Sequence, residues 1–369
     1  MKEEQKRPEW VPSTGENEDA FTTTVMKGAM QPSRPKQAVR KKQLTIEEME
    51  AGVRANNRTI LAQAITLVES NAQKHQQKAQ ALIQSLLPHT GRSIRIGITG
   101  VPGAGKSTFI EAFGTMLCKK GHKVAVLAVD PSSTLTHGSI LGDKTRMEQL
   151  VQQPNAFVRP SPSGGALGGV NRRTRETMLL CEAAGYDVIL VETVGVGQSE
   201  GIVRDMVDFF LLLTLTGAGD ELQGIKRGIL ELTDGILINK ADGDNKIRAL
   251  QTASLYTQMV HLFQPVTEGW DVEVNCCSAL YNEGLDIFWE SVQKFTHVTK
   301  QSSVFQKRRN KQNRNWMYAA IQEHLQQRFF SNPMMKEMLP LYEKEILEGT
   351  KTVTAAVVQL MDYYEQKSF

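Results

Sequence analysis

The chain has 369 residues, and its 43 lysines and arginines against 40 aspartates and glutamates give a formal charge of +3. Apolar residues make up 40% of the sequence, which excludes a mainly disordered or fibrous chain and predicts a sizeable buried core. No stretch approaches the roughly 18 consecutive apolar residues that a membrane span needs. Together with the nearly balanced charge, this predicts a globular protein without a nucleic-acid or membrane partner.

The four cysteines predict a reducing compartment. They are too few and too irregularly spaced for a disulfide framework. The first residues mix acids with bases and lack the apolar core of a secretory signal. We therefore expect a cytoplasmic protein.

Residues 1–43 and 44–92 differ in composition and in the periodicity of their apolar residues. Residues 1–43 combine proline and charge without amphipathic period, which predicts a flexible tail. The basic cluster 40–42 is interpreted as a solvated linker end, although a nucleic-acid or membrane patch remains an alternative. In 44–92 Thr45 and Glu48 fit a capping box, the helical pattern breaks near Asn56, and Pro88 ends it. This segment is predicted to be helical.

Residues 93–299 alternate short apolar runs with helical stretches. Crossover helices of this length imply a mostly parallel central sheet covered on both faces, an α/β fold. The predicted strands are 94–99, 124–129, 188–191, 209–215, 235–238 and 272–276.

Residues 300–369 are predicted to form a helical arm. Apolar residues recur at helical spacing around Ile321 and again around Leu360. An arm of this size buries little by itself, and we expect it to form an oligomer interface. The basic run Lys307-Arg308-Arg309 is interpreted as a solvated helix start.

A phosphate-binding loop is the most specific motif in the sequence. It follows the first predicted strand and matches G-x-x-x-x-G-K-[S/T] in full, which predicts a P-loop NTPase fold. Its glycines let backbone amides turn toward phosphate oxygens at the positive end of the next helix. The lysine would reach the β- and γ-phosphates, and the serine hydroxyl would bind Mg²⁺. The predicted nucleotide contacts are Gly100, Val101, Pro102, Gly103, Ala104, Gly105, Lys106, Ser107 and Thr108.

A second motif, N-K-x-D, ends a strand about 130 residues later and predicts guanine recognition. The Asp242 carboxylate can accept two hydrogen bonds from the guanine edge, whereas adenine offers no such donor pair. Asn239 would brace the loops, and the Lys240 stem would pack on the purine. After the last strand, Ser278, Ala279 and Leu280 would give a backbone contact to the guanine oxygen, or form a plain strand-to-helix turn.

Two carboxylates follow strands at the edge where an open α/β sheet binds ligands. Asp130 and Glu192 could hold Mg²⁺ directly or through water, orient the attacking water, or cap helices. The Gly195 amide has the spacing of a γ-phosphate sensor. Many GTPases carry next a glutamine that orients water, but Val196 stands here, with Gln198 beyond it. We infer slow intrinsic hydrolysis that depends on a partner.

Three further stretches carry a family resemblance: 130–147, 192–200 (E-T-V-G-V-G-Q-S-E) and 217–226 (G-A-G-D-E-L-Q-G-I-K). With the phosphate loop and 239–245, they closely resemble the MeaB/ArgK family of P-loop GTPases, whose human relative is the methylmalonic aciduria type A protein. The resemblance covers about residues 44–369. One departure is His137, where the family usually has glycine.

The resemblance implies a homodimeric GTPase chaperone of an adenosylcobalamin-dependent acyl-CoA mutase, chiefly methylmalonyl-CoA mutase. It would gate cofactor loading and protect or rescue the mutase. Asp130, Asp143 and Glu192 would complete the Mg²⁺ environment around Ser107. The stretch 217–228 would relay the nucleotide state to the mutase, with Asp220, Gln223 and Lys226 as polar candidates.

Two alternative functions have weaker support in the sequence. A GTPase that inserts a metal needs Cys or His ligands that close around the ion, but Cys276 and Cys277 are adjacent on a strand and point to opposite faces. A kinase of periplasmic transport binding proteins, an older label for the family, has no supporting feature in the sequence. The client could also be isobutyryl-CoA or ethylmalonyl-CoA mutase.

Overall fold

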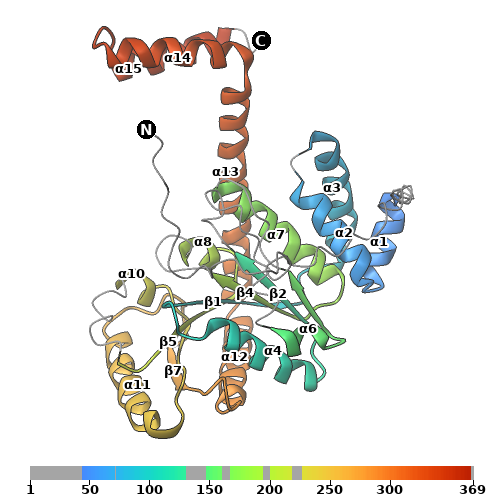
Figure 1. Cartoon of the computed structure of the whole chain (residues 1–369), viewed down its shortest axis with the longest axis vertical. Helices are drawn as coiled ribbons and strands as arrows, with labels where there is room; N and C mark the ends of the chain where they lie inside the picture. Colours follow the sequence, from blue (N-terminus) through green and yellow to red (C-terminus); the bar gives the residue numbers. More distant parts are fainter. Residues whose placement is uncertain are drawn as a thin grey trace, which may run out of the picture. The chain divides into compact units, whose positions relative to one another are not determined.

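The computed structural model describes residues 44–70, 72–129, 147–159, 167–193, 200–217 and 227–366. Within these ranges seven strands form one sheet in the order β3-β2-β4-β1-β5-β6-β7, and every pairing is parallel (Figure 1). The predicted α/β class is confirmed. The strands are β1 (Ile94–Gly100), β2 (Val124–Val129), β3 (Ala156–Arg159), β4 (Val188–Thr193), β5 (Phe209–Thr214), β6 (Gly235–Ile238) and β7 (Glu273–Cys276).

Strand β3 is an addition to the predicted set. It has four residues, lies at the sheet edge and pairs with β2. Two of its four residues are only half-buried. Its apolar run is also too short to predict a strand from the sequence. The other strands match the predicted ranges within two residues.

The two faces of the sheet are covered by different helices, as Figure 1 shows. One core packs α4 (Lys106–Lys119), α11 (Lys246–Val260) and α12 (Leu285–Gln301) against alternate strand residues such as Leu190. The opposite core packs α7, α8 and the helices of residues 46–86 against the intervening residues, such as Ile189. Helix α7 spans Leu167–Ala183 and α8 spans Glu200–Arg204. The carboxyl edge of the strands therefore stays available for a site.

The N-terminal segment forms three helices, α1 (Ile46–Arg54), α2 (Arg58–Glu69) and α3 (Gln73–Leu86). The capping box is confirmed: the Thr45 hydroxyl accepts from the Glu48 amide, and the Glu48 carboxylate accepts from the Thr45 amide. A short 3₁₀ turn, η1 (Leu87–His89), follows α3 at Pro88. These helices share the core beneath α7, and residues 45–369 form one compact unit.

Three helices form the C-terminal arm: α13 (Val304–Ser331), α14 (Pro333–Leu347) and α15 (Val353–Gln366). The apolar pattern predicts α13 and α15, whereas α14 contains Pro340 and has no counterpart in the predicted set. Helices α14 and α15 share a small core of their own around Met335 and Leu360. Shorter elements elsewhere are α6 (Glu148–Gln152), α10 (Arg227–Leu230) and η2 (Gly243–Asn245).

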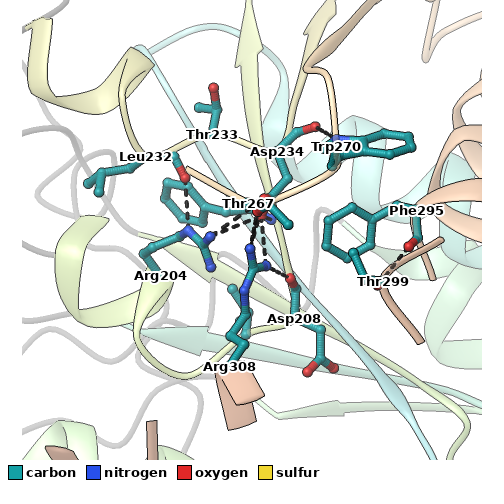
Figure 2. A network of polar contacts seen from close by, with 12 residues as sticks. Arg204, Asp208, Leu232, Thr233, Asp234, Thr267, Trp270, Phe295, Thr299 and Arg308 are labelled. Atoms are coloured by element: carbon teal, nitrogen blue, oxygen red, sulfur yellow. Dashed lines mark hydrogen bonds and ion pairs between the residues drawn. The ribbon is translucent and has the colours of Figure 1, made fainter. Parts of the chain in front are cut away.

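The start of α13 is anchored by buried charges, so the interpretation of residues 307–309 as a solvated helix start is wrong for both arginines. Arg309 is 8% exposed and donates to the two carboxylate oxygens of Asp208 at 2.7 and 2.6 Å. Arg308 donates to both oxygens of Asp234 at 3.2 Å, and also to Thr267 (Figure 2). An unpaired arginine cannot be buried at low cost, but two aspartates supply the partners.

The same cluster reaches α8. Arg204, the last residue of α8, donates to the Leu232 carbonyl at 2.9 Å and lies 3.5 Å from the Asp234 carboxylate (Figure 2). Gln312 on α13 donates to the Val207 carbonyl at 2.7 Å. The arm is therefore joined to the helix that follows residues 194–199.

Among the helices that the structure describes, none has both the length and the apolar character required to cross a bilayer.

Candidate functional site

The candidate site is built around the turn from β1 into α4, where two glycines are required. A Cβ added at Gly100 would lie 2.1 Å from the Leu213 carbonyl oxygen on β5, which no side chain could tolerate. Gly105 has φ +84°, a left-handed conformation, and its Cβ would meet the Asn239 amide nitrogen at 2.8 Å. The sequence motif therefore reflects a tight turn held against β5 and against Asn239, the residue that follows β6.

Lys106 and Ser107 open α4 beside the carboxyl end of β4. The Lys106 ammonium donates to the Gly100 carbonyl at 2.8 Å. Burial lowers the pKa of Lys106, and the charge of Glu192 partly offsets this. The Ser107 hydroxyl donates to the carboxylate of Glu192, which is 6% exposed, at 3.4 Å. A cation, a hydroxyl and a carboxylate thus meet at a positive helix end, an arrangement suited to phosphate and a hard cation.

Asn239 ties the phosphate loop to the loop after β7. Its side-chain amide donates to the Ala104 carbonyl at 2.8 Å, and its oxygen accepts from the Ala279 backbone amide at 3.1 Å. The side chain is 2% exposed, so this link is fixed inside the protein. One residue therefore sets the spacing between two loops that lie 135 and 40 residues from it in sequence.

The N-K-x-D loop stands at the end of β6. The Asp242 carboxylate accepts from the buried Ser278 hydroxyl at 2.5 Å, which orients it. Lys240 has φ +59°, and Leu280 is 69% exposed at the rim. The structure thus brings Asp242, Ser278 and Ala279 together around Asn239.

Sequence reasoning assigned no role to two residues that shape this region. The Cys277 thiol lies 3.4 Å from the Asn239 oxygen. Asn245 donates to the Lys240 carbonyl at 2.7 Å, holding its left-handed backbone, and accepts from the Thr216 hydroxyl at 2.7 Å. Asn245 stands in the family-like stretch, but a single asparagine carries no local signal of such contacts.

Several predicted site residues lie outside the described residues: Asp130, Asp143, Gly195, Lys226, and also His137, Val196, Gln198, Asp220 and Gln223. Of the predicted metal ligands, Ser107 and Glu192 are described and adjacent. In the part of the chain that the structure describes, no group of three or more His, Cys, Asp or Glu side chains could hold a metal ion.

Comparison with known proteins connects this geometry to a family. Residues 61–334 match the family model of the methylmalonyl-CoA mutase-associated GTPase MeaB. The GTPase ArgK of Escherichia coli is 44% identical over 329 residues, which cover 88% of this chain and 98% of ArgK. The mitochondrial methylmalonic aciduria type A homolog of Mus musculus is 43% identical, with 89% of this chain and 81% of the mouse protein covered.

The crystal structure of an LAO/AO transport system kinase has the same fold, with a TM-score of 0.69 at 38% identity, and covers 87% of this chain and 97% of that one. The predicted P-loop GTPase resemblance is therefore confirmed, and the chain is a GTP-hydrolysing enzyme. It belongs to the MeaB family of GTPases.

Proposed function

We propose that this GTPase is a chaperone of an adenosylcobalamin-dependent acyl-CoA mutase, with methylmalonyl-CoA mutase as its client. In this role it gates cofactor loading and protects or reactivates the mutase. The observation that carries the proposal is the family match over residues 61–334, since the family is named for its association with that mutase. The relation to the methylmalonic aciduria type A homolog supports the same client.

In the proposed site, Lys106 and the amides of 100–108 hold the β- and γ-phosphates. Lys106 already lies against the loop, and its contact with the Gly100 carbonyl supports this role. Ser107 and Glu192 would hold Mg²⁺, because their oxygens are adjacent and are of the kind that Mg²⁺ prefers. When bound, Mg²⁺ would neutralise charge on the phosphate oxygens. Asp130 and Asp143 stay predicted members of this environment.

Asn239, Lys240 and Asp242 form the proposed guanine site, together with the turn 278–280. The hydrogen bond from Ser278 leaves one Asp242 oxygen without a described partner, while Asn239 fixes the loop spacing. We expect adenine to be rejected, because it offers no donor pair to the half-buried Asp242 carboxylate.

Intrinsic turnover is proposed to be slow. Val196 offers no side chain that could orient water, so a group from the mutase or from the loops must complete the site. Gly195 would sense the γ-phosphate, and Lys226 would belong to the relay. Loss of the γ-phosphate contacts changes the order of such loops and supplies the switch.

The arm is proposed to form the homodimer interface. Its helices carry apolar side chains that are at least 40% exposed, which is a sign of an interaction surface. They include Ile321, Leu325, Phe330, Leu341, Val357 and Met361.

The test is GTP turnover by the purified full chain, alone and with the methylmalonyl-CoA mutase of the same organism. We expect slow turnover by the chain alone and clear stimulation by the mutase. If Lys226 relays the nucleotide state to the mutase, Lys226→Ala should lose this stimulation. Rapid turnover alone would contradict the partner requirement. Stimulation by isobutyryl-CoA or ethylmalonyl-CoA mutase, without any by methylmalonyl-CoA mutase, would overturn the assigned client.

A further inference from the structure

A cavity of about 400 Å³ opens at the sheet edge opposite the phosphate loop. It lies at the amino ends of β1 and β4 and beside the junction of α12 with α13. Its lining is mostly apolar and includes Trp289, Val292 and Phe305, each at most 8% exposed. The phosphate loop follows the carboxyl end of β1, so this cavity is separate from the nucleotide site.

The rim of the cavity carries positive charge. Arg92, His297 and Lys300 line it and are exposed. The lining acid, Asp187, is occupied: one oxygen lies 2.7 Å from the His122 ring nitrogen and the other accepts from a backbone amide at 2.7 Å. Within the described part of the chain no carboxylate forms an ion pair with Arg92 or Lys300, and the His297 imidazole lies on the same rim. Arg92 and Lys300 against Asp187 leave a net positive charge around this apolar hollow.

We propose that this cavity binds a small molecule with a flat apolar body and one anionic group, a carboxylate or a phosphate. The cavity volume falls in the range of small-molecule sites, roughly 300–1,000 Å³, and such sites combine apolar walls with a few polar groups. The Trp289 and Phe305 rings supply the walls. Arg92 and Lys300 supply charge-assisted hydrogen bonds to the anion.

A ligand in this cavity also touches the anchor of the arm. Phe305 belongs to the first turn of α13, and its ring lies 4.7 Å from the Arg309 guanidinium on one side and 5.3 Å from the Lys300 ammonium on another. Arg309 in turn holds Asp208. A bound ligand would therefore contact Phe305, which packs on Arg309, one of the residues that hold α13 against the sheet.

The test is calorimetric titration of the full chain with its nucleotide site saturated by GDP, so that phosphate cannot report on that site. The probes are 1-naphthyl phosphate, 1-naphthoate and the uncharged 1-naphthalenemethanol. We expect at least one anionic probe to bind tenfold or more tightly than the alcohol. The tighter of the two anions identifies the headgroup as phosphate or carboxylate.

The charge-reversed variant Arg92→Glu/Lys300→Glu should weaken the anionic probe at least tenfold. The matched control Lys307→Glu/Lys311→Glu makes the same charge change at two exposed residues of α13 that do not line the cavity, and should leave binding within twofold. The proposal is overturned if neither anion binds, if the alcohol binds equally well, or if both variants lose affinity to the same extent.

Discussion

The nucleotide site and the buried charge cluster beneath α13 lie at opposite edges of one sheet, and they are encoded in different ways. The phosphate loop is eight contiguous residues, and its chemistry can be inferred from local spacing. The cluster joins Asp208, Asp234 and Arg309 across as many as 101 residues of sequence. Each of its members is an ordinary charged residue that becomes informative only in the fold.

The two regions also use charge for different ends. At the carboxyl edge, Lys106 is close to one carboxylate and remains available to a ligand. At the amino edge, the arginines form ion pairs with buried aspartates. These pairs are Arg204 and Arg308 with Asp234, and Arg309 with Asp208. Burial lowers the pKa of Arg204, and nearby Asp234 opposes this. The first arrangement is proposed to bind phosphate, and the second holds α13 against the sheet.

The largest expected effect is on stability. Arg309→Met leaves Asp208 buried, at 1% exposure, without its bidentate partner, which typically costs about 3–5 kcal/mol. Chemical denaturation should show this loss in the free energy of unfolding. Lys307→Met, an exposed neighbour on α13, is the control and should change it by less than about 0.5 kcal/mol. Equal losses in the two variants would refute the anchoring role.

Lys106→Ala should lower GTP turnover and leave the free energy of unfolding nearly unchanged. If Lys106 binds the phosphates as proposed, its removal should lower kcat/KM for GTP by about 10²–10³-fold. The free energy of unfolding should change little, because Lys106 is only half-buried. Lys119→Ala, exposed at the end of the same helix, is the matched control. Steady-state phosphate release measures the turnover of both variants. Unchanged turnover in Lys106→Ala would contradict the assignment of Lys106 to the phosphate site.

Glu182 offers a smaller effect at the amino edge. Burial alone would raise its pKa, but the charge of Arg95 and hydrogen bonds from Arg95, Ser93 and Gly91 outweigh burial and lower the pKa below its ordinary range. A carboxylate with a lowered folded pKa stabilises the protein above its unfolded pKa, and this contribution is lost as pH falls through the folded value.

Glu182→Gln should therefore cost about 1–3 kcal/mol near pH 7. The difference from the wild type should shrink below about pH 4.5 as the native carboxylate becomes protonated. Denaturation midpoints measured from pH 3 to 7 test this. A difference that is constant across that range would show that the charge of Glu182 is not involved.

The parts of the molecule that the sequence predicted are those with local or periodic signals. Short apolar runs between helical stretches predicted six strands. The Thr45 capping box and the phosphate loop could be predicted from neighbouring residues alone. Strand β3 was too short, and Pro340 concealed α14. The partners of Arg308 and Arg309 were beyond reach, because a basic run predicts solvent exposure unless acids from distant strands are known to converge on it.

The most direct test of the nucleotide site is competition by GTP and ATP against a fluorescent GDP analogue on the wild type and on Asp242→Asn. We expect GTP to displace the analogue from the wild type at a concentration about 100-fold or more below that of ATP, and Asp242→Asn to lose most of this preference. Equal displacement by the two nucleotides from the wild type would contradict guanine recognition by the loop that Asn239 and Ser278 hold in place.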